Sequence, residues 1–159
     1  MKGQKKYYFL GSVFTSVFVL LLVVLTAWYV YAQIKKPGDM FFTEKITIIK
    51  TFEPKEAMEL IQKNANNPNF VILDIRTPEE FDSGHIAGAI NINYHSDSFI
   101  EDLDKLDKSK TYLVYCRTGR RSGDAVSIMT RLGFKEIYRI KGDIVKWKSE
   151  GLPVVTKRK

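Results

Sequence analysis

Two short apolar runs in the middle of the chain constrain its fold more than any other feature. Residues 70–75 read Phe-Val-Ile-Leu-Asp-Ile and residues 112–115 read Tyr-Leu-Val-Tyr. Such unbroken runs are typical of strands that are covered on both faces, as in parallel sheets. A stretch with helical features follows each run, from Thr77 to just before Gly84 and from 122 to 132. The sequence therefore predicts an α/β domain with a mostly parallel central sheet and helices on both faces.

The other segments of the domain continue this alternation. We expect strands at 46–52, 89–92 and 137–140, and helices at 54–62, 98–106 and 144–149. Local signals support the boundaries: a capping box formed by Thr77 and Glu80, with Pro78 in the first turn, and a left-handed cap at Gly133.

An uncharged apolar run, residues 8–32, precedes the domain. Roughly 20 apolar residues cross a bilayer, so we expect one transmembrane helix here. A cleaved signal peptide ending near Ala32 is the alternative, but such peptides have apolar regions of only about 7–15 residues. The basic tail, residues 1–7, favours a cytoplasmic N-terminus and hence an extracytoplasmic domain, although Lys35 and Lys36 weaken this bias. We expect a single-pass membrane protein with a tether at 33–42, the folded domain at 43–155 and a basic tail at 156–159.

The charge distribution argues against a nucleic-acid partner. The formal net charge is +7, but the first 36 residues contain five lysines and no acid, which leaves 20 basic against 18 acidic residues. A nearly neutral body is not the basic face of a nucleic-acid binder. The chain has one cysteine and two histidines, which excludes an internal disulfide and makes a structural zinc site improbable. We expect neither a metal nor a cofactor.

The single cysteine, Cys116, comes directly after the second apolar run, at the end of a strand where parallel sheets bind their ligands. Amides of a tight turn, a helix N-terminus and guanidinium groups all stabilise an anion. These surroundings favour a thiolate and would also hold an anionic substrate with an electrophilic atom. The alternative is a small buried cysteine beside solvated arginines. The candidate loop consists of Arg117, Thr118, Gly119, Arg120, Arg121 and Ser122.

Four stretches of the chain, in their order, resemble a single rhodanese domain: VILDIRTPEEFDSGHIAGAINI (71–92), YLVYCRTGRRS (112–122), LGFKEIYRIKGDIVKW (132–147) and EGLPVV (150–155). The resemblance implies that Cys116 is the nucleophile that carries sulfane sulfur as a persulfide, held by the loop that follows it. It also implies a structural acid and base pair, Asp74 and Arg76, near the site. His85 falls in the family's entry motif, and we interpret it as structural support.

The expected function is therefore a membrane-anchored sulfurtransferase. It would take sulfur from a small anionic donor such as thiosulfate and pass it to a thiol or protein acceptor, or to cyanide. A catalytically idle rhodanese-like module, tethered to the membrane for binding or sensing, is the alternative outside enzymology.

A cysteine phosphatase of the related cell-cycle type is disfavoured by loop length. That chemistry needs a seven-residue loop with cysteine first and arginine last, and here Ser122 stands in the last position. The chain also departs from the rhodanese pattern, because Gly142-Asp143 replaces two glycines before the last helix. Asp143 is able to cap that helix, so we expect the fold to be retained and only the local shape of one wall to differ.

Overall fold

The computed structural model describes residues 19–32 and 46–156. The chain divides into two units, residues 1–44 and 45–159. The first contains a helix over residues 19–32, whose side chains are exposed. Within the two described ranges, no helix is both long enough and apolar enough to cross a membrane. Residues 8–18 of the predicted span, the basic tail at 1–7 and the tether at 33–42 lie outside the described residues.

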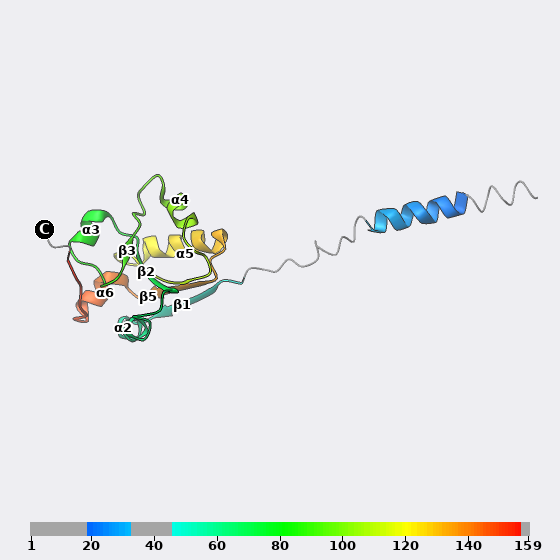
Figure 1. Ribbon diagram of the computed structural model, residues 1–159. Coiled ribbons are helices and arrows are strands. Elements are labelled where there is room, and N and C mark those ends of the chain that lie inside the picture. Colours follow the sequence, from blue (N-terminus) through cyan, green and yellow to red (C-terminus); the bar gives the residue numbers. More distant parts are fainter. Residues whose placement is uncertain (1–18, 33–45, 157–159) are drawn as a thin grey trace, which may run out of the picture. The chain divides into compact units, whose positions relative to one another are not determined.

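The second unit is built on a five-stranded sheet in which every pairing is parallel. The strand order is β1-β5-β4-β2-β3 (Figure 1), so β4 lies at the centre of the sheet. This arrangement confirms the predicted α/β class and parallel sheet. The strands are β1 (Ile48–Phe52), β2 (Phe70–Asp74), β3 (Ile90–Asn91), β4 (Thr111–Tyr115) and β5 (Glu136–Ile140).

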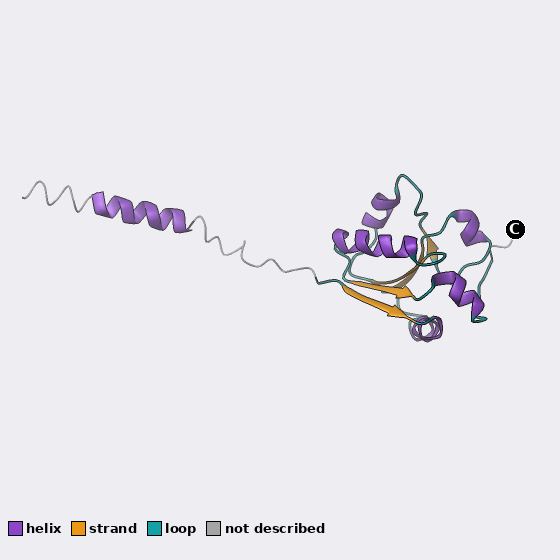
Figure 2. Cartoon of the chain, turned by 180° about the vertical axis from the view of Figure 1, so that it is seen from behind, coloured by secondary structure: helices purple, strands orange, loops and turns teal. Residues whose placement is uncertain are grey.

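Helices cover both faces of the sheet, as Figures 1 and 2 show. Side chains of α4 and α5 form one apolar core with alternate residues of β2 and β4, such as Leu73 and Val114. Side chains of α2 and α6 form a second core with the intervening residues, such as Ile72 and Leu113. Burial on both faces explains why these strands are unbroken apolar runs. The helices are α2 (Pro54–Lys63), α3 (Pro78–Asp82), α4 (Phe99–Asp104), α5 (Arg120–Leu132) and α6 (Asp143–Ser149).

The predicted helix boundaries are confirmed where a local signal sets them. Thr77 and Glu80 form a reciprocal capping box at the start of α3, and Gly133 ends α5 in the left-handed conformation with φ 85°. Helix α5 differs from the prediction, because it begins at Arg120 rather than Ser122. Gly119 is its N-cap, which places Arg120 and Arg121 in the first turn.

Candidate functional site

Cys116 lies at the carboxyl end of the central strand, where the chain turns into α5. The turn is made possible by Gly119, whose φ of 106° is accessible to glycine but strained for residues with a β-carbon. The Gly119 N–H consequently points back and donates to Cys116 Sγ at 3.2 Å. The sulfur therefore lies at the N-terminus of a 13-residue helix, where the helix dipole and a backbone donor favour negative charge.

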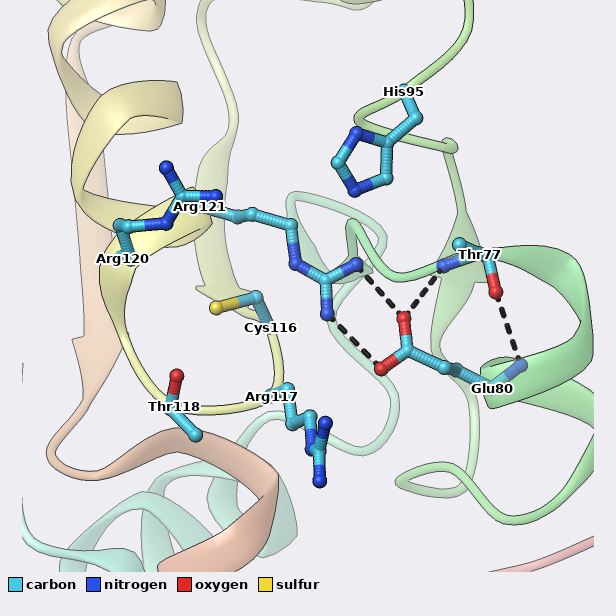
Figure 3. A pocket seen from close by; sticks show the side chains of 8 residues that line it. All are labelled: Thr77, Glu80, His95, Cys116, Arg117, Thr118, Arg120 and Arg121. Carbon is cyan, nitrogen blue, oxygen red and sulfur yellow. Dashed lines mark hydrogen bonds and ion pairs between the residues drawn. The ribbon is translucent and has the colours of Figure 1, made fainter.

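A pocket of about 350 Å³ opens over the sulfur (Figure 3). Four of the predicted loop residues line it together with Cys116, and the other two do not. Gly119 donates its N–H to the Cys116 sulfur, as described above. Ser122 is buried and donates its hydroxyl to Gly119 O at 3.2 Å. The lining residues are Thr77, Glu80, His95, Cys116, Arg117, Thr118, Arg120 and Arg121.

The three arginines of the loop differ in their surroundings. Arg121 makes a bidentate ion pair with Glu80, at 2.8 and 3.0 Å, and Glu80 also accepts the Thr77 N–H at 3.1 Å. The hydrogen bond from Arg121 lowers the pKa of Glu80. Glu80 in turn raises the pKa of Arg121, and the nearby Cys116 sulfur raises it further. Arg121 is thus largely committed to Glu80, while Arg117 and Arg120 are exposed and available to an anionic ligand.

The first turn of α6 makes hydrogen bonds to the backbone of the Cys116 loop. Asp143 Oδ1 accepts the Cys116 N–H at 2.5 Å, and Ile144 N–H donates to Cys116 O at 3.2 Å. Asp143 does not cap α6, because Gly142 is the N-cap and no side chain forms a cap hydrogen bond there. Asp143 is the first helical residue and adopts a left-handed φ of 54°. Its carboxylate therefore anchors the backbone of Cys116 and does not cap its own helix.

Arg139 on β5 supports the other end of the loop. Its Nη2 donates to Gly119 O at 2.8 Å and to Ser122 Oγ at 3.1 Å. Two buried polar atoms of these supporting side chains have no hydrogen-bond partner among the described residues, namely Arg139 Nε and Asp143 Oδ2. An acidic and a basic side chain therefore hold the loop backbone, Asp143 at the Cys116 N–H and Arg139 at Gly119 O.

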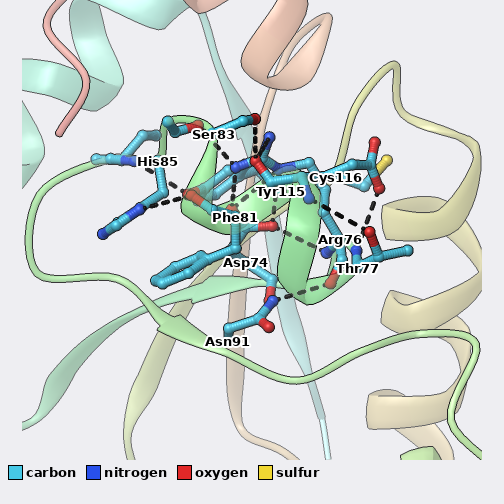
Figure 4. Close-up of polar contacts among 12 residues, drawn as sticks. Asp74, Arg76, Thr77, Phe81, Ser83, His85, Asn91, Tyr115 and Cys116 are labelled. Atoms are coloured by element: carbon cyan, nitrogen blue, oxygen red, sulfur yellow. Dashed lines mark hydrogen bonds and ion pairs between the residues drawn. The ribbon is translucent and has the colours of Figure 1, made fainter. Parts of the chain in front are cut away.

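Asp74 and Arg76 form a buried ion pair at the carboxyl end of β2 (Figure 4), with Nη2 and Oδ2 at 2.6 Å. Burial acts to lower the pKa of Arg76, but the Asp74 carboxylate outweighs it and the pKa is raised. The guanidinium also donates to Glu80 O at 2.9 Å and to Gly84 O at 3.0 Å. Neither residue lines the pocket. The pair therefore holds the middle of α3 and the turn after it against the end of β2, and so supports the helix from which Glu80 reaches Arg121.

His85 also lies outside the pocket. Its ring stacks on Phe81 with centroids 3.6 Å apart, and Nδ1 is hydrogen-bonded to Phe81 O at 2.8 Å. Its backbone pairs with Val155 at 2.9 and 2.8 Å. These contacts tie the turn after α3 to the C-terminal segment.

Sequence reasoning missed three pocket residues, Thr77, Glu80 and His95, and two supporting residues, Asp143 and Arg139. Thr77 and Glu80 were recognised only as a cap. His95 carried one usable signal, because it follows β3 at the sheet edge where parallel strands bind ligands. Asp143 and Arg139 are distant from Cys116 in the chain and carry no local signal for this role.

Known proteins resemble the chain in sequence and in structure. A protein named sulfurtransferase from Allochromatium vinosum is 29% identical over 100 residues, which covers 63% of this chain and 92% of the relative. The thiosulfate:glutathione sulfurtransferase of Saccharomyces cerevisiae is 27% identical over 120 residues, covering 69% and 85% of the two chains. The crystal structure of a rhodanese-related protein from Thermoplasma volcanium superimposes with a TM-score of 0.57 at 31% identity, over 68% of this chain and 99% of that one.

The sequence pattern of the rhodanese-like domain matches residues 54–150, a segment that runs from the start of α2 to just beyond α6. It contains the central strand, the Cys116 loop, the Asp74 and Arg76 pair, and the first turn of α6. The chain therefore belongs to the rhodanese-like domain family.

Proposed function

We propose that this protein is a membrane-anchored sulfurtransferase that moves sulfane sulfur from a small anionic donor such as thiosulfate to an acceptor, through a persulfide on Cys116. One observation carries the proposal. The Cys116 sulfur lies at the N-terminus of α5, accepts the Gly119 N–H, and lines a pocket with three arginines. A thiolate and an anionic donor are both favoured by such a site.

In the first step the Cys116 thiolate attacks the outer sulfur of thiosulfate. A bond forms between the two sulfurs, the sulfur–sulfur bond of thiosulfate breaks, and sulfite leaves with the electron pair. Arg117 and Arg120 are exposed on the pocket wall and suit the sulfonate oxygens, because guanidinium groups bind oxyanions with charge-assisted hydrogen bonds. The Gly119 N–H and the helix dipole then stabilise negative charge on the persulfide.

In the second step an acceptor takes the outer sulfur and returns Cys116 to the thiolate. A thiol suits this role in the cell, and cyanide suits it in an assay. The thiol assignment is supported by the Saccharomyces cerevisiae relative, whose name identifies glutathione as its partner.

We extend the proposal to the N-terminal segment, which would anchor the enzyme in a bilayer through residues 8–32. Support comes from the absence of charge over that stretch and from the helix at 19–32, whose apolar side chains are exposed. The basic residues 1–7 favour an extracytoplasmic catalytic domain. A reporter enzyme fused after Lys159, active on only one side of the membrane, tests the orientation.

Intact mass spectrometry tests the sulfurtransferase activity directly. The full chain and a Cys116→Ser variant are each incubated with thiosulfate. We expect the first to gain one sulfur atom, which cyanide removes, and the variant to gain none. If neither thiosulfate nor a second persulfide donor adds sulfur, a membrane-tethered binding module becomes the better account.

A further inference from the structure

His95 lies in the Cys116 pocket and has no role in the proposal above. Figure 3 shows its ring across the pocket from Arg117 and Thr118, with Cys116 and Arg121 between them. The side chain is exposed. Within the described part of the chain, no hydrogen bond engages either ring nitrogen of His95, so both are available to an incoming molecule.

The loop that carries His95, residues 93–98, is held in place from both sides. The Tyr94 N–H donates to Ile75 O at 3.2 Å, which brings this loop beside the end of β2. The Tyr94 hydroxyl is 3.1 Å from Asp124 Oδ2 on α5, the helix that begins beneath the sulfur. The rings of Tyr94 and His95 pack edge to face with centroids 5.3 Å apart. These contacts of Tyr94 therefore fix the position of the loop segment that carries His95.

The second step of sulfur transfer requires a base if the acceptor is a thiol. A thiol must lose its proton to become a strong nucleophile. Hydroxyl groups are weak bases and arginine has no acceptor, which removes Thr77, Thr118 and the three arginines. Glu80 is unsuitable because both its oxygens accept hydrogen bonds and Arg121 lowers its pKa. Among the described pocket residues, only His95 has a free basic nitrogen.

We infer that His95 is the general base for thiol acceptors, an assignment that rests on the proposed sulfurtransferase function. His95 takes the proton of the thiol as its sulfur forms a bond to the outer persulfide sulfur. The sulfur–sulfur bond at Cys116 breaks, and its electron pair stays on Sγ as a thiolate. One neutral sulfur atom and one proton have then moved, so the step needs no external oxidant or reductant.

The test compares a thiol with an acceptor that has no proton to lose. Full-length chain is loaded with thiosulfate, freed of donor and mixed with excess glutathione or excess sulfite. Sulfite attacks through a sulfur lone pair and needs no base. We expect His95→Gln to slow single-turnover discharge to glutathione by about 100-fold, the lower end of general-base contributions. Loading by thiosulfate and discharge to sulfite should remain at the wild-type rate.

Asp97→Asn is the matched control, because Asp97 is exposed in the same loop and does not line the pocket. It should change neither rate. Equal slowing with both acceptors would mean that His95 only shapes the pocket, and unchanged glutathione discharge would mean that another group takes the proton. Either result overturns the inference and leaves sulfur transfer intact. If the wild-type chain takes up no sulfur from thiosulfate, the loading step itself shows it, and that result overturns both the proposed function and the role of His95.

Discussion

The contact between Asp143 and the backbone of Cys116 can be tested by paired substitutions. Asp143→Ala removes the carboxylate but keeps a β-carbon at the left-handed φ of 54°. Asp143→Gly removes the carboxylate and also frees the backbone from the steric cost of that conformation. The difference between the two variants therefore reports backbone strain, and the loss in Asp143→Ala reports the hydrogen bond together with the poorer tolerance of alanine for the left-handed conformation.

The structure sets the expected magnitudes. Cys116 is buried, so loss of the acceptor for its N–H leaves an unsatisfied donor that costs about 1–3 kcal/mol of unfolding free energy. A left-handed residue with a β-carbon costs about 1–2 kcal/mol, partly offset in the glycine variant by roughly 0.5–1 kcal/mol of chain entropy. We expect Asp143→Ala to lose about 1–3 kcal/mol and Asp143→Gly to be about 1 kcal/mol more stable than it.

Thermal unfolding of the full chain, in one buffer and detergent, measures the stability loss of Asp143→Ala and the difference between the alanine and glycine variants. For a domain of this size 1 kcal/mol corresponds to about 4 °C, so Asp143→Ala should unfold about 4–12 °C below wild type. Asp143→Asn keeps an acceptor and a residue that tolerates this backbone, and should lose less than the alanine variant. The reasoning is refuted if alanine equals wild type, or if glycine is less stable than alanine.

Two further predictions concern the ion pairs beside the site. Arg76→Met leaves the fully buried Asp74 carboxylate without its ion-pair partner and should lower the free energy of unfolding by about 3–5 kcal/mol, measured by heat or urea. A loss below about 1 kcal/mol would contradict a structural role for the pair. The pKa of Glu80 is lowered in the folded protein because Arg121 donates to its carboxylate. The ion pair therefore stabilises the fold above the usual glutamate pKa, and this stabilisation is lost as the pH falls through the lowered pKa of the folded protein. The difference in Tm between wild type and Glu80→Gln should therefore shrink below about pH 4, and a constant difference down to pH 3 would argue that the ion pair does not stabilise the fold.

Much of the candidate site could be predicted because its position follows from strand order and local turns. Cys116 follows a run that is apolar on both faces, and only a central parallel strand buries both faces in this way. The capping box at Thr77 depends on residues three positions apart, and the structure retains it. The start of α5 was predicted two residues late, because Gly119 as the N-cap was not recognised.

The cap that Asp143 is able to form is absent for a similar reason. A carboxylate next to a helix start usually accepts from the N–H groups of its own helix, which is a local preference. The Cys116 N–H lies 27 positions away in sequence and competes for the same carboxylate. That competition exists only after β4 and the first turn of α6 have been brought together.

Taken alone, the sequence determined what depends on neighbours along the chain: the alternation of strands and helices, the caps, and a single thiol placed before a helix N-terminus. Tertiary structure decided which charges meet. Arg121 pairs with Glu80, Asp143 and Arg139 support the two ends of the loop, and His95 comes from the edge of the sheet to the pocket over Cys116. The physical reason is that these side chains approach only through parallel strand pairing, which joins segments far apart in the chain and leaves no periodic mark in the sequence.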